Sequence, residues 1–323
     1  MMRTDDKTTL GRSILDLYAD GLRAGVTYAE PLVKTGLHHE RDYVGLSQAG
    51  KCMRQVVLGL YPGVTKADPE ISSLDAFHAG NLGENDIRAI LKAGGVTAYR
   101  VGWQVGAGPG VEGHIDGVLR LMWDTEDDDE DPGLFLQVGE PEFARGLYSF
   151  ALLEIKTMRA FPFPKLIGKQ GGRNSDPPLH VMEERDAGYL LNHGTLKDEN
   201  LLNYLQIQSY MLAIRQYATQ VPCAVYLGRD RDSGKIAVEV IEYDGEAAEQ
   251  AVTSLVTIAQ GMNDRLVPPR RWAGGDLDPE NPKGWMGNAK YCPVRDACIS
   301  IGGIEQINGM EYVPAPDDFG VWR

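Results

Sequence analysis

The stretch LLEIKT, at residues 152–157, places two charged residues at alternate positions of an apolar segment. Successive side chains of a β-strand point to opposite faces, so Glu154 and Lys156 project from one face about 7 Å apart, while Leu153 and Ile155 face the other way. Charges in this pattern either line a solvated sheet face or converge on a ligand. The stretch therefore predicts a strand with one apolar and one charged face.

Segments on both sides of this stretch predict the rest of the sheet. Short runs rich in β-branched, aromatic or aliphatic residues, with turn residues between them, occur at 98–105, 113–123, 134–137 and 148–158. Residues 224–227 and 236–243 flank the turn Asp232-Ser233-Gly234 and predict a hairpin.

Helical spacing of apolar residues marks the remaining elements, at 9–24, 74–93, 200–217 and 245–266, and Ser47 is placed to cap another helix that ends before Pro62. The order of elements predicts an α/β fold with a central mixed β-sheet flanked by helices.

Three regions follow from this order. Residues 1–46 form an N-terminal helical segment, and residues 47–266 form the core, in which 158–200 is a long loop or insertion followed by helical turns. Residues 267–323, rich in Pro, Gly, Trp and charge, form a cysteine-containing tail that we expect to pack back on the core.

The bulk composition excludes some classes of protein. A net charge of −14 argues against a protein that coats nucleic acid through its general field, because phosphate binding relies on Lys and Arg. Much of the excess lies in the acidic run 124–131, which is typical of a solvated loop. No stretch approaches the roughly 18 consecutive apolar residues of a membrane span, and the chain starts without the basic and apolar regions of a signal peptide, so we expect a cytoplasmic protein.

Further polar residues in short motifs lie upstream and downstream of the charged strand. Asp116 is in GHIDG, between Gly113 and Gly117. Further upstream, Glu84 ends the stretch GNLGE within a predicted helix. Gln206 and Tyr210 are four residues apart and therefore share one side of a helix. Each of these is commonplace alone, and their order and spacing make the set specific.

Together these residues resemble the PD-(D/E)XK nucleases of the RecB type, including the CRISPR-associated iron–sulfur exonucleases and their phage relatives. The resemblance covers roughly residues 47–298. It rests on a Gly-x-x-x-Glu helix (80–84), Gly-x-x-Asp (113–116), Glu-x-Lys (154–156) and Gln-x-x-x-Tyr (206–210). Many members have His where this chain has Glu84.

The resemblance implies a role for each matched residue. Asp116 and Glu154 would hold Mg²⁺ or Mn²⁺ directly, with Glu84 and the Ile155 carbonyl as further ligands. Lys156 would orient the nucleophilic water or neutralise developing charge. Gln206 and Tyr210 are implied to position this centre and nearby DNA.

Basic residues near the motifs are candidates for guiding the DNA backbone despite the acidic total. They are Lys51, Arg54, Arg159, Lys165, Lys169, Arg173, Arg270 and Arg271.

The four cysteines, at 52, 223, 292 and 298, are too few and too unevenly spaced for a disulfide scaffold, and we expect them to be reduced. In the iron–sulfur relatives one cysteine precedes the nuclease core and three follow it. Cys52, Cys292 and Cys298 match three of these positions, and the fourth falls on Ala289, which cannot ligate. The three thiols could hold an iron–sulfur cluster, a zinc ion or nothing.

The sequence and its resemblance predict a metal-dependent DNA exonuclease in recombination, repair or phage DNA processing, with DNA and recombination or repair proteins as partners. If the chain is phage-encoded, its compartment is the host cytoplasm. The alternatives are a non-catalytic DNA-end-binding or protein-interaction module that retains the fold, and a structural metalloprotein organised by the cysteines. Cleavage polarity, strand preference and oligomeric state stay open.

Overall fold

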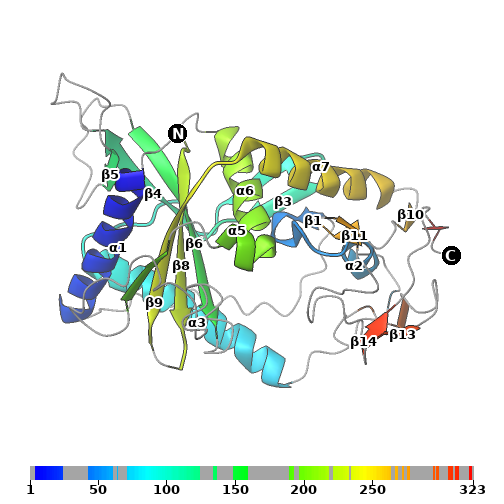
Figure 1. Ribbon diagram of the computed structural model, residues 1–323, viewed down its shortest axis with the longest axis horizontal. Coiled ribbons are helices and arrows are strands. Elements are labelled where there is room, and N and C mark those ends of the chain that lie inside the picture. Colours follow the sequence, from blue (N-terminus) through cyan, green and yellow to red (C-terminus); the bar gives the residue numbers. More distant parts are fainter. Residues whose placement is uncertain are drawn as a thin grey trace, which may run out of the picture.

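The computed structural model describes residues 4–24, 43–60, 64, 71–123, 134–136, 148–158, 189–192, 196–217, 221–232, 234–262, 266–267, 271–272, 275–276, 294, 296–297, 305–307, 310–312 and 320–321. Helices stand on both sides of a central sheet (Figure 1).

The central sheet has six strands in the order β5-β4-β6-β8-β9-β7. They are β4 (Gly117–Trp123), β5 (Leu134–Leu136), β6 (Tyr148–Met158), β7 (Tyr189–Asn192), β8 (Cys223–Asp230) and β9 (Ile236–Glu242). The pairs β6/β8 and β7/β9 are parallel, and β4/β5, β4/β6 and β8/β9 are antiparallel. The predicted α/β fold with a mixed sheet is thereby confirmed.

A second sheet of three strands lies beside the start of β4. It contains β1 (Val44–Gly45), β2 (Gln104–Gly108) and β3 (Val111–His114) in the order β1-β3-β2. The strand predicted over residues 113–123 is therefore two strands, because the chain leaves one sheet after His114 and enters the other at Gly117. Asp116 lies in the gap.

The helices agree with the predicted pattern except near Ser47. They are α1 (Thr4–Ala24), α2 (Met53–Leu60), α3 (Ile71–Ala93), α5 (Leu196–Glu199), α6 (Leu201–Arg215) and α7 (Gly245–Met262). Ser47 caps no α-helix, since it lies inside the 3₁₀-helix Leu46–Gln48 and α2 begins only at Met53. The cap of α6 is Asn200, whose side chain accepts a hydrogen bond from the Asn203 N–H.

Two layers of apolar side chains hold the helices on the sheet. Leu152 of β6 packs among buried residues of α6 and α7, whereas Leu153 and Ile155 pack among those of α1 and α3. The alternation of a strand thus assigns the two faces of β6 to different helix layers. On the second side, α1 and α3 cross where Gly21 faces the Ile90 carbonyl and Gly94 faces the Leu17 carbonyl, with no room for a side chain on either glycine.

The stretch predicted as a loop at 158–200 contributes one strand to the sheet. β7 pairs in parallel with β9 at the sheet edge, and α5 follows it. Four residues are too short a segment to give a period-2 pattern, which is why the sequence did not predict this strand.

The last described segments form three short strand pairs: β10 (Leu266–Val267) with β15 (Gly320–Val321), β11 (Arg271–Trp272) with β12 (Gly275–Asp276), and β13 (Glu305–Ile307) with β14 (Met310–Tyr312). The backbones of β10 and β11 lie beside α2. Of the helices in the described ranges, none has the length and apolar character to cross a bilayer.

Candidate active site

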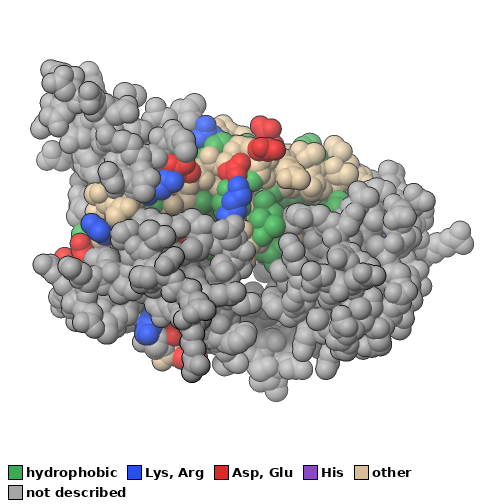
Figure 2. Space-filling view, viewed as in Figure 1, with side chains coloured by type: hydrophobic (Ala, Val, Ile, Leu, Met, Phe, Trp, Pro, Cys, Tyr) green, Lys and Arg blue, Asp and Glu red, His purple; other side chains and the backbone are tan. Residues whose placement is uncertain are grey.

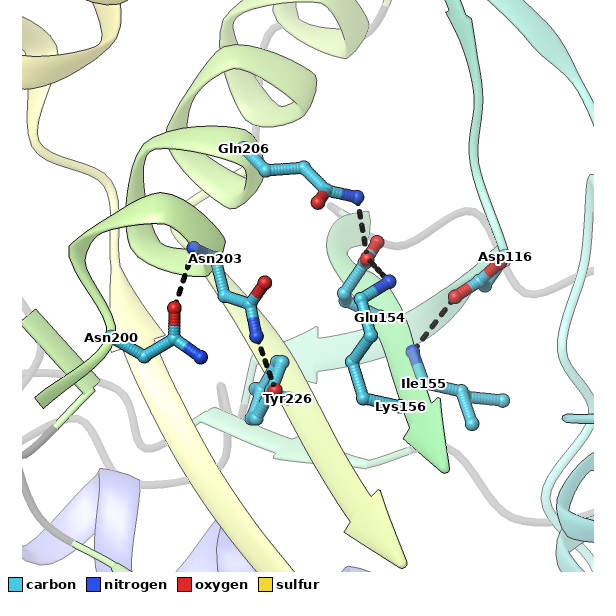
Figure 3. A network of polar contacts seen from close by, with 8 residues as sticks. All are labelled: Asp116, Glu154, Ile155, Lys156, Asn200, Asn203, Gln206 and Tyr226. Carbon is cyan, nitrogen blue, oxygen red and sulfur yellow. Dashed lines mark hydrogen bonds and ion pairs between the residues drawn. The ribbon is translucent and has the colours of Figure 1, made fainter. Parts of the chain in front are cut away.

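The charged face of β6 is buried beneath α6 rather than solvated. Glu154 is only 2% exposed, and its Oε1 forms an ion pair with the Lys156 ammonium, whose side chain is 29% exposed. Figure 3 shows both side chains on β6, with Gln206 and Asp116 directed toward the strand from different sides. The interpretation of this pattern as a solvated sheet face is therefore wrong.

Asp116 reaches β6 from the gap between the two sheets. Gly117 pairs with Leu153, so the preceding residue, Asp116, lies level with Glu154. One oxygen of the Asp116 carboxylate, Oδ2, accepts a hydrogen bond of 2.8 Å from the Ile155 N–H. The backbone of β6 thereby fixes Asp116 beside the ion pair of Glu154 and Lys156.

Helix α6 supplies the third part of the site. Gln206 donates its Nε2–H to Glu154 Oε1 over 2.8 Å. One turn later, Tyr210 is 3% exposed and packs on β3, where a side chain at Gly113 would come within 2.6 Å of the Tyr210 ring. Tyr210 thus wedges α6 against the strand that leads to Asp116.

Helix α3 approaches the end of β6 through two glycines. A Cβ atom at Gly83 would meet Thr157 Cγ2 at 2.5 Å, and the Thr157 hydroxyl donates to the Gly80 carbonyl at 3.4 Å. This close approach brings half-buried Glu84 near enough to raise the pKa of Glu154.

The acid groups compete for charge in this buried setting. The pKa of Glu154 is raised to about 7, because burial and, to a smaller extent, the Asp116 and Glu84 carboxylates raise it by more than Lys156 lowers it. Burial lowers the pKa of Lys156, but the Glu154 and Asp116 carboxylates outweigh it and hold the pKa above its ordinary value. Near neutral pH the site therefore holds one ammonium, that of Lys156, beside the carboxyl groups of Glu154, Asp116 and Glu84.

Two residues absent from the sequence prediction extend this polar face. Tyr226 of β8 pairs with Glu154 in register, is 2% exposed, and accepts a hydrogen bond of 2.9 Å from Asn203 of α6. The sequence holds a signal for Asn203, which precedes Gln206 by three residues and so lies on the same side of the helix. The position of Tyr226 requires the strand register, which the sequence does not give.

Several predicted site residues fall elsewhere. Arg54 is 1% exposed and belongs to the interior, and Cys52, 5% exposed, is buried at the start of α2. Lys51 is exposed, and of Arg271 only the backbone is described. The remaining predicted DNA contacts (Arg159, Lys165, Lys169, Arg173 and Arg270) and Cys292, Ala289 and Cys298 lie outside the described residues.

A cavity of about 640 Å³ opens between α5, α6, α7 and residues 48–53. Its lining includes Lys51, Lys197, Tyr204 and Asp244, and none of the residues around Glu154. Asp244 accepts hydrogen bonds from the Tyr204 hydroxyl at 2.9 Å and the Lys197 ammonium at 3.0 Å. Figure 2 shows hydrophobic side chains beside acidic and basic ones on this face. Three of its polar groups, Lys197, Tyr204 and Asp244, are thus bonded to one another.

The similarity of this chain to known proteins lies among solved structures. No family model matches the sequence, and no curated protein matches it. Among solved structures, the fold is similar to LHK-Exo in complex with dAMP, with 13% identity over 70% of this chain and 90% of that one and a TM-score of 0.39. It is also similar to SSO0001, with 12% identity over 90% and 93% and a TM-score of 0.33.

Proposed function

We propose that this protein is a metal-dependent deoxyribonuclease with a PD-(D/E)XK core, acting on DNA ends as an exonuclease in recombination, repair or phage DNA processing. The observation that carries the proposal is the buried convergence of Asp116, Glu154 and Lys156 on β6, held by Gln206 of α6. A structural role alone does not account for it, because burying charges costs stability that apolar residues would not cost.

The donor set fits a hard divalent cation. Asp116, Glu154 and Glu84 offer carboxylate oxygens and the Ile155 carbonyl a neutral one, which are the ligands that Mg²⁺ and Mn²⁺ prefer. Within the described ranges no three Asp, Glu, His or Cys side chains are grouped so that they could hold a metal ion by themselves, so the proposed set would have to move closer together and include the Ile155 carbonyl. Burial is the main reason that the pKa of Glu154 is raised, and the Asp116 and Glu84 carboxylates, whose charge a bound cation would offset, contribute a smaller part. When bound, the cation would polarise the phosphate and activate water.

The protein's own groups would do the positioning. The Ile155 N–H orients the Asp116 carboxylate, and Gln206 orients that of Glu154, so both acids are held before any ligand arrives. Lys156 stays protonated near neutral pH and places a positive charge where negative charge develops on the reacting phosphate.

End-labelled single-stranded and double-stranded DNA, incubated with Mg²⁺, Mn²⁺ or chelator, tests this function. We expect metal-dependent release of nucleotides from linear DNA and none from covalently closed circles. Glu154→Gln should be inactive, whereas Glu249→Gln, an exposed carboxylate of α7, should retain activity. DNA binding without cleavage under every metal would instead favour the non-catalytic end-binding module.

For the cysteine site we propose a retained metal, either an iron–sulfur cluster completed by a non-cysteine ligand or a zinc ion. Its support is the match of Cys52, Cys292 and Cys298 to the family spacing. Protein purified anaerobically should contain iron and sulfide, or zinc, in stoichiometric amounts, and Cys52→Ser should lose them. Protein that contains no iron, sulfide or zinc would contradict this proposal and show that the three cysteines are ordinary thiols.

A further inference from the structure

An aromatic cluster stands on the surface next to the loop that carries Asp116. The Trp103 ring meets the Tyr217 ring edge to face, with 5.0 Å between centroids, and the Arg100 guanidinium lies 5.1 Å from the Trp103 centroid. We call Arg100, Trp103 and Tyr217 the aromatic platform. Contacts of this kind orient flat π surfaces and a cation together.

The outer part of the platform is exposed to solvent rather than packed in the core. Tyr217 is 61% exposed and the neighbouring Val101 41%, and they are two of the three large hydrophobic side chains described as exposed. Arg100 is exposed as well, while Trp103 packs partly against the core. Trp103 thus anchors a surface whose outer part, Tyr217, offers a free ring face to solvent.

Backbone hydrogen bonds tie the platform to the candidate active site. The Gly102 N–H donates to the Ile115 carbonyl at 3.0 Å, and the Ile115 N–H donates to the Trp103 carbonyl at 3.1 Å. The turn at residues 100–103 is therefore paired with the residue that precedes Asp116. The platform and Asp116 are thereby held close together along the chain.

Helix α6 links the same two places. Helix α6 ends at Arg215, nine residues and about 14 Å along the axis from Gln206, and Tyr217 lies in the turn that follows, where its N–H donates to the Ile214 carbonyl at 2.8 Å. With a rise of 3.4 Å per nucleotide in a stacked strand, this is a separation of a few nucleotides. Gln206 at one end contacts the acid centre, and Tyr217 at the other end carries the platform.

The backbone at Arg100 shows that the turn is held at a conformational cost. Arg100 has φ 56°, and it is the one non-glycine residue of the described chain with positive φ. A side chain in this region is strained, and such residues cluster at ligand sites. In this conformation the Arg100 guanidinium lies over the Trp103 ring.

We infer that the aromatic platform stacks an unpaired nucleobase of single-stranded DNA, a few nucleotides from the scissile phosphate. This inference rests on the proposed function for its choice of ligand. A planar base is complementary to the exposed Tyr217 ring, every base has such a face, and Arg100 supplies the positive charge for the backbone. Binding here would be tolerant of sequence and selective for unpaired strands.

Abasic scanning tests the platform in the Glu154→Gln background, in which the DNA should stay intact. Short oligonucleotides, each lacking one base at a different position, are titrated by fluorescence anisotropy. We expect Tyr217→Ala to weaken binding of intact single-stranded DNA roughly tenfold. Tyr217→Phe should retain affinity, and the matched control Gln216→Ala, the exposed neighbour, should be unchanged.

One abasic position should weaken binding by Glu154→Gln protein to a similar extent and cost nothing further in the Tyr217→Ala variant, because the two changes remove the same contact. Additive losses, or unaltered affinity in Tyr217→Ala, would overturn the inference while leaving cleavage by the wild type intact. If the wild type cleaves no DNA but still loses affinity at one abasic position through Tyr217, the platform is supported and the proposed function is removed.

Discussion

The two faces of β6 differ in what their burial achieves. Leu153 and Ile155 are fully buried against α1 and α3, as a core strand requires, whereas Glu154 on the opposite face is almost as deeply buried among charges. Burial of the apolar face stabilises the folded protein, because apolar surface is removed from water. Burial of the polar face destabilises it, because charged groups lose their hydration. The same strand therefore separates stability from chemistry, and substitutions on each face should affect different measurements.

The largest effect is expected on the polar face. Glu154→Gln or Asp116→Asn should lower the rate of DNA cleavage about a thousandfold or more, since several kcal/mol of transition-state stabilisation depend on these oxygens. The free energy of unfolding should stay unchanged or rise, because a charge with a raised pKa is removed in Glu154→Gln. Parallel cleavage assays and denaturant titrations measure both. Substantial magnesium-dependent activity in Asp116→Asn would contradict its role.

The apolar face should show the reverse pattern. Ile155→Ala or Leu153→Ala should lower the free energy of unfolding by about 2–5 kcal/mol, as cavities in well-packed cores do. Activity per folded molecule should stay within a few fold at low temperature. A variant that stays fully stable, measured by urea titration, would show that α1 and α3 do not depend on this layer.

The polar face should also make the stability depend on pH. The pKa of Glu154 in the folded protein is about 7, above its ordinary 4.5, so folding favours the protonated acid. Its stabilisation is complete below pH 4.5 and is lost as the pH rises through 7, by an amount of about 3 kcal/mol at most. Thermal unfolding in chelator should show this decline, and Glu154→Gln should flatten it. An equal decline in Glu154→Gln would assign the proton to another group.

The smallest effect is expected at the edge of the polar face. Tyr226→Phe removes the oxygen that accepts from Asn203 and should cost about 0.5–1.5 kcal/mol of stability. Because Asn203 lies one turn before Gln206, cleavage should fall by less than tenfold at saturating DNA. A loss as large as that of Glu154→Gln would place the Tyr226 hydroxyl in the reaction itself.

The difference between the faces also explains what the sequence could predict. The alternation in LLEIKT is local, so the sequence places Glu154 and Lys156 on one face. Helical spacing places Gln206 and Tyr210 on one side of a helix, and only the family resemblance links that side to the site. The partner of Glu154 across the sheet is not local. Tyr226 lies opposite it only because β8 follows β6 in parallel after a long excursion, a pairing that propensities do not encode.

The same reason accounts for the predictions that differ from the structure. Residues 113–123 have the composition of one strand, but pairing with β2 on one side and β6 on the other divides them at Asp116. Ser47 has the chemistry of a helix cap, yet β1 and the 3₁₀-helix occupy that position. In each case tertiary pairing overrode a local preference.

The contact between α1 and α3 bears on how the chain tolerates mutation. At Gly21 and Gly94 the two helix backbones touch, so any larger residue must push the helices apart. Helix α3 leads to Gly94 and also carries Glu84 near β6, so a displacement at Gly94 would shift the helix that positions Glu84. In a saturation library, positions 21 and 94 should be depleted of nearly every substitution, and an activity screen would score these remote glycines like residues of the active site.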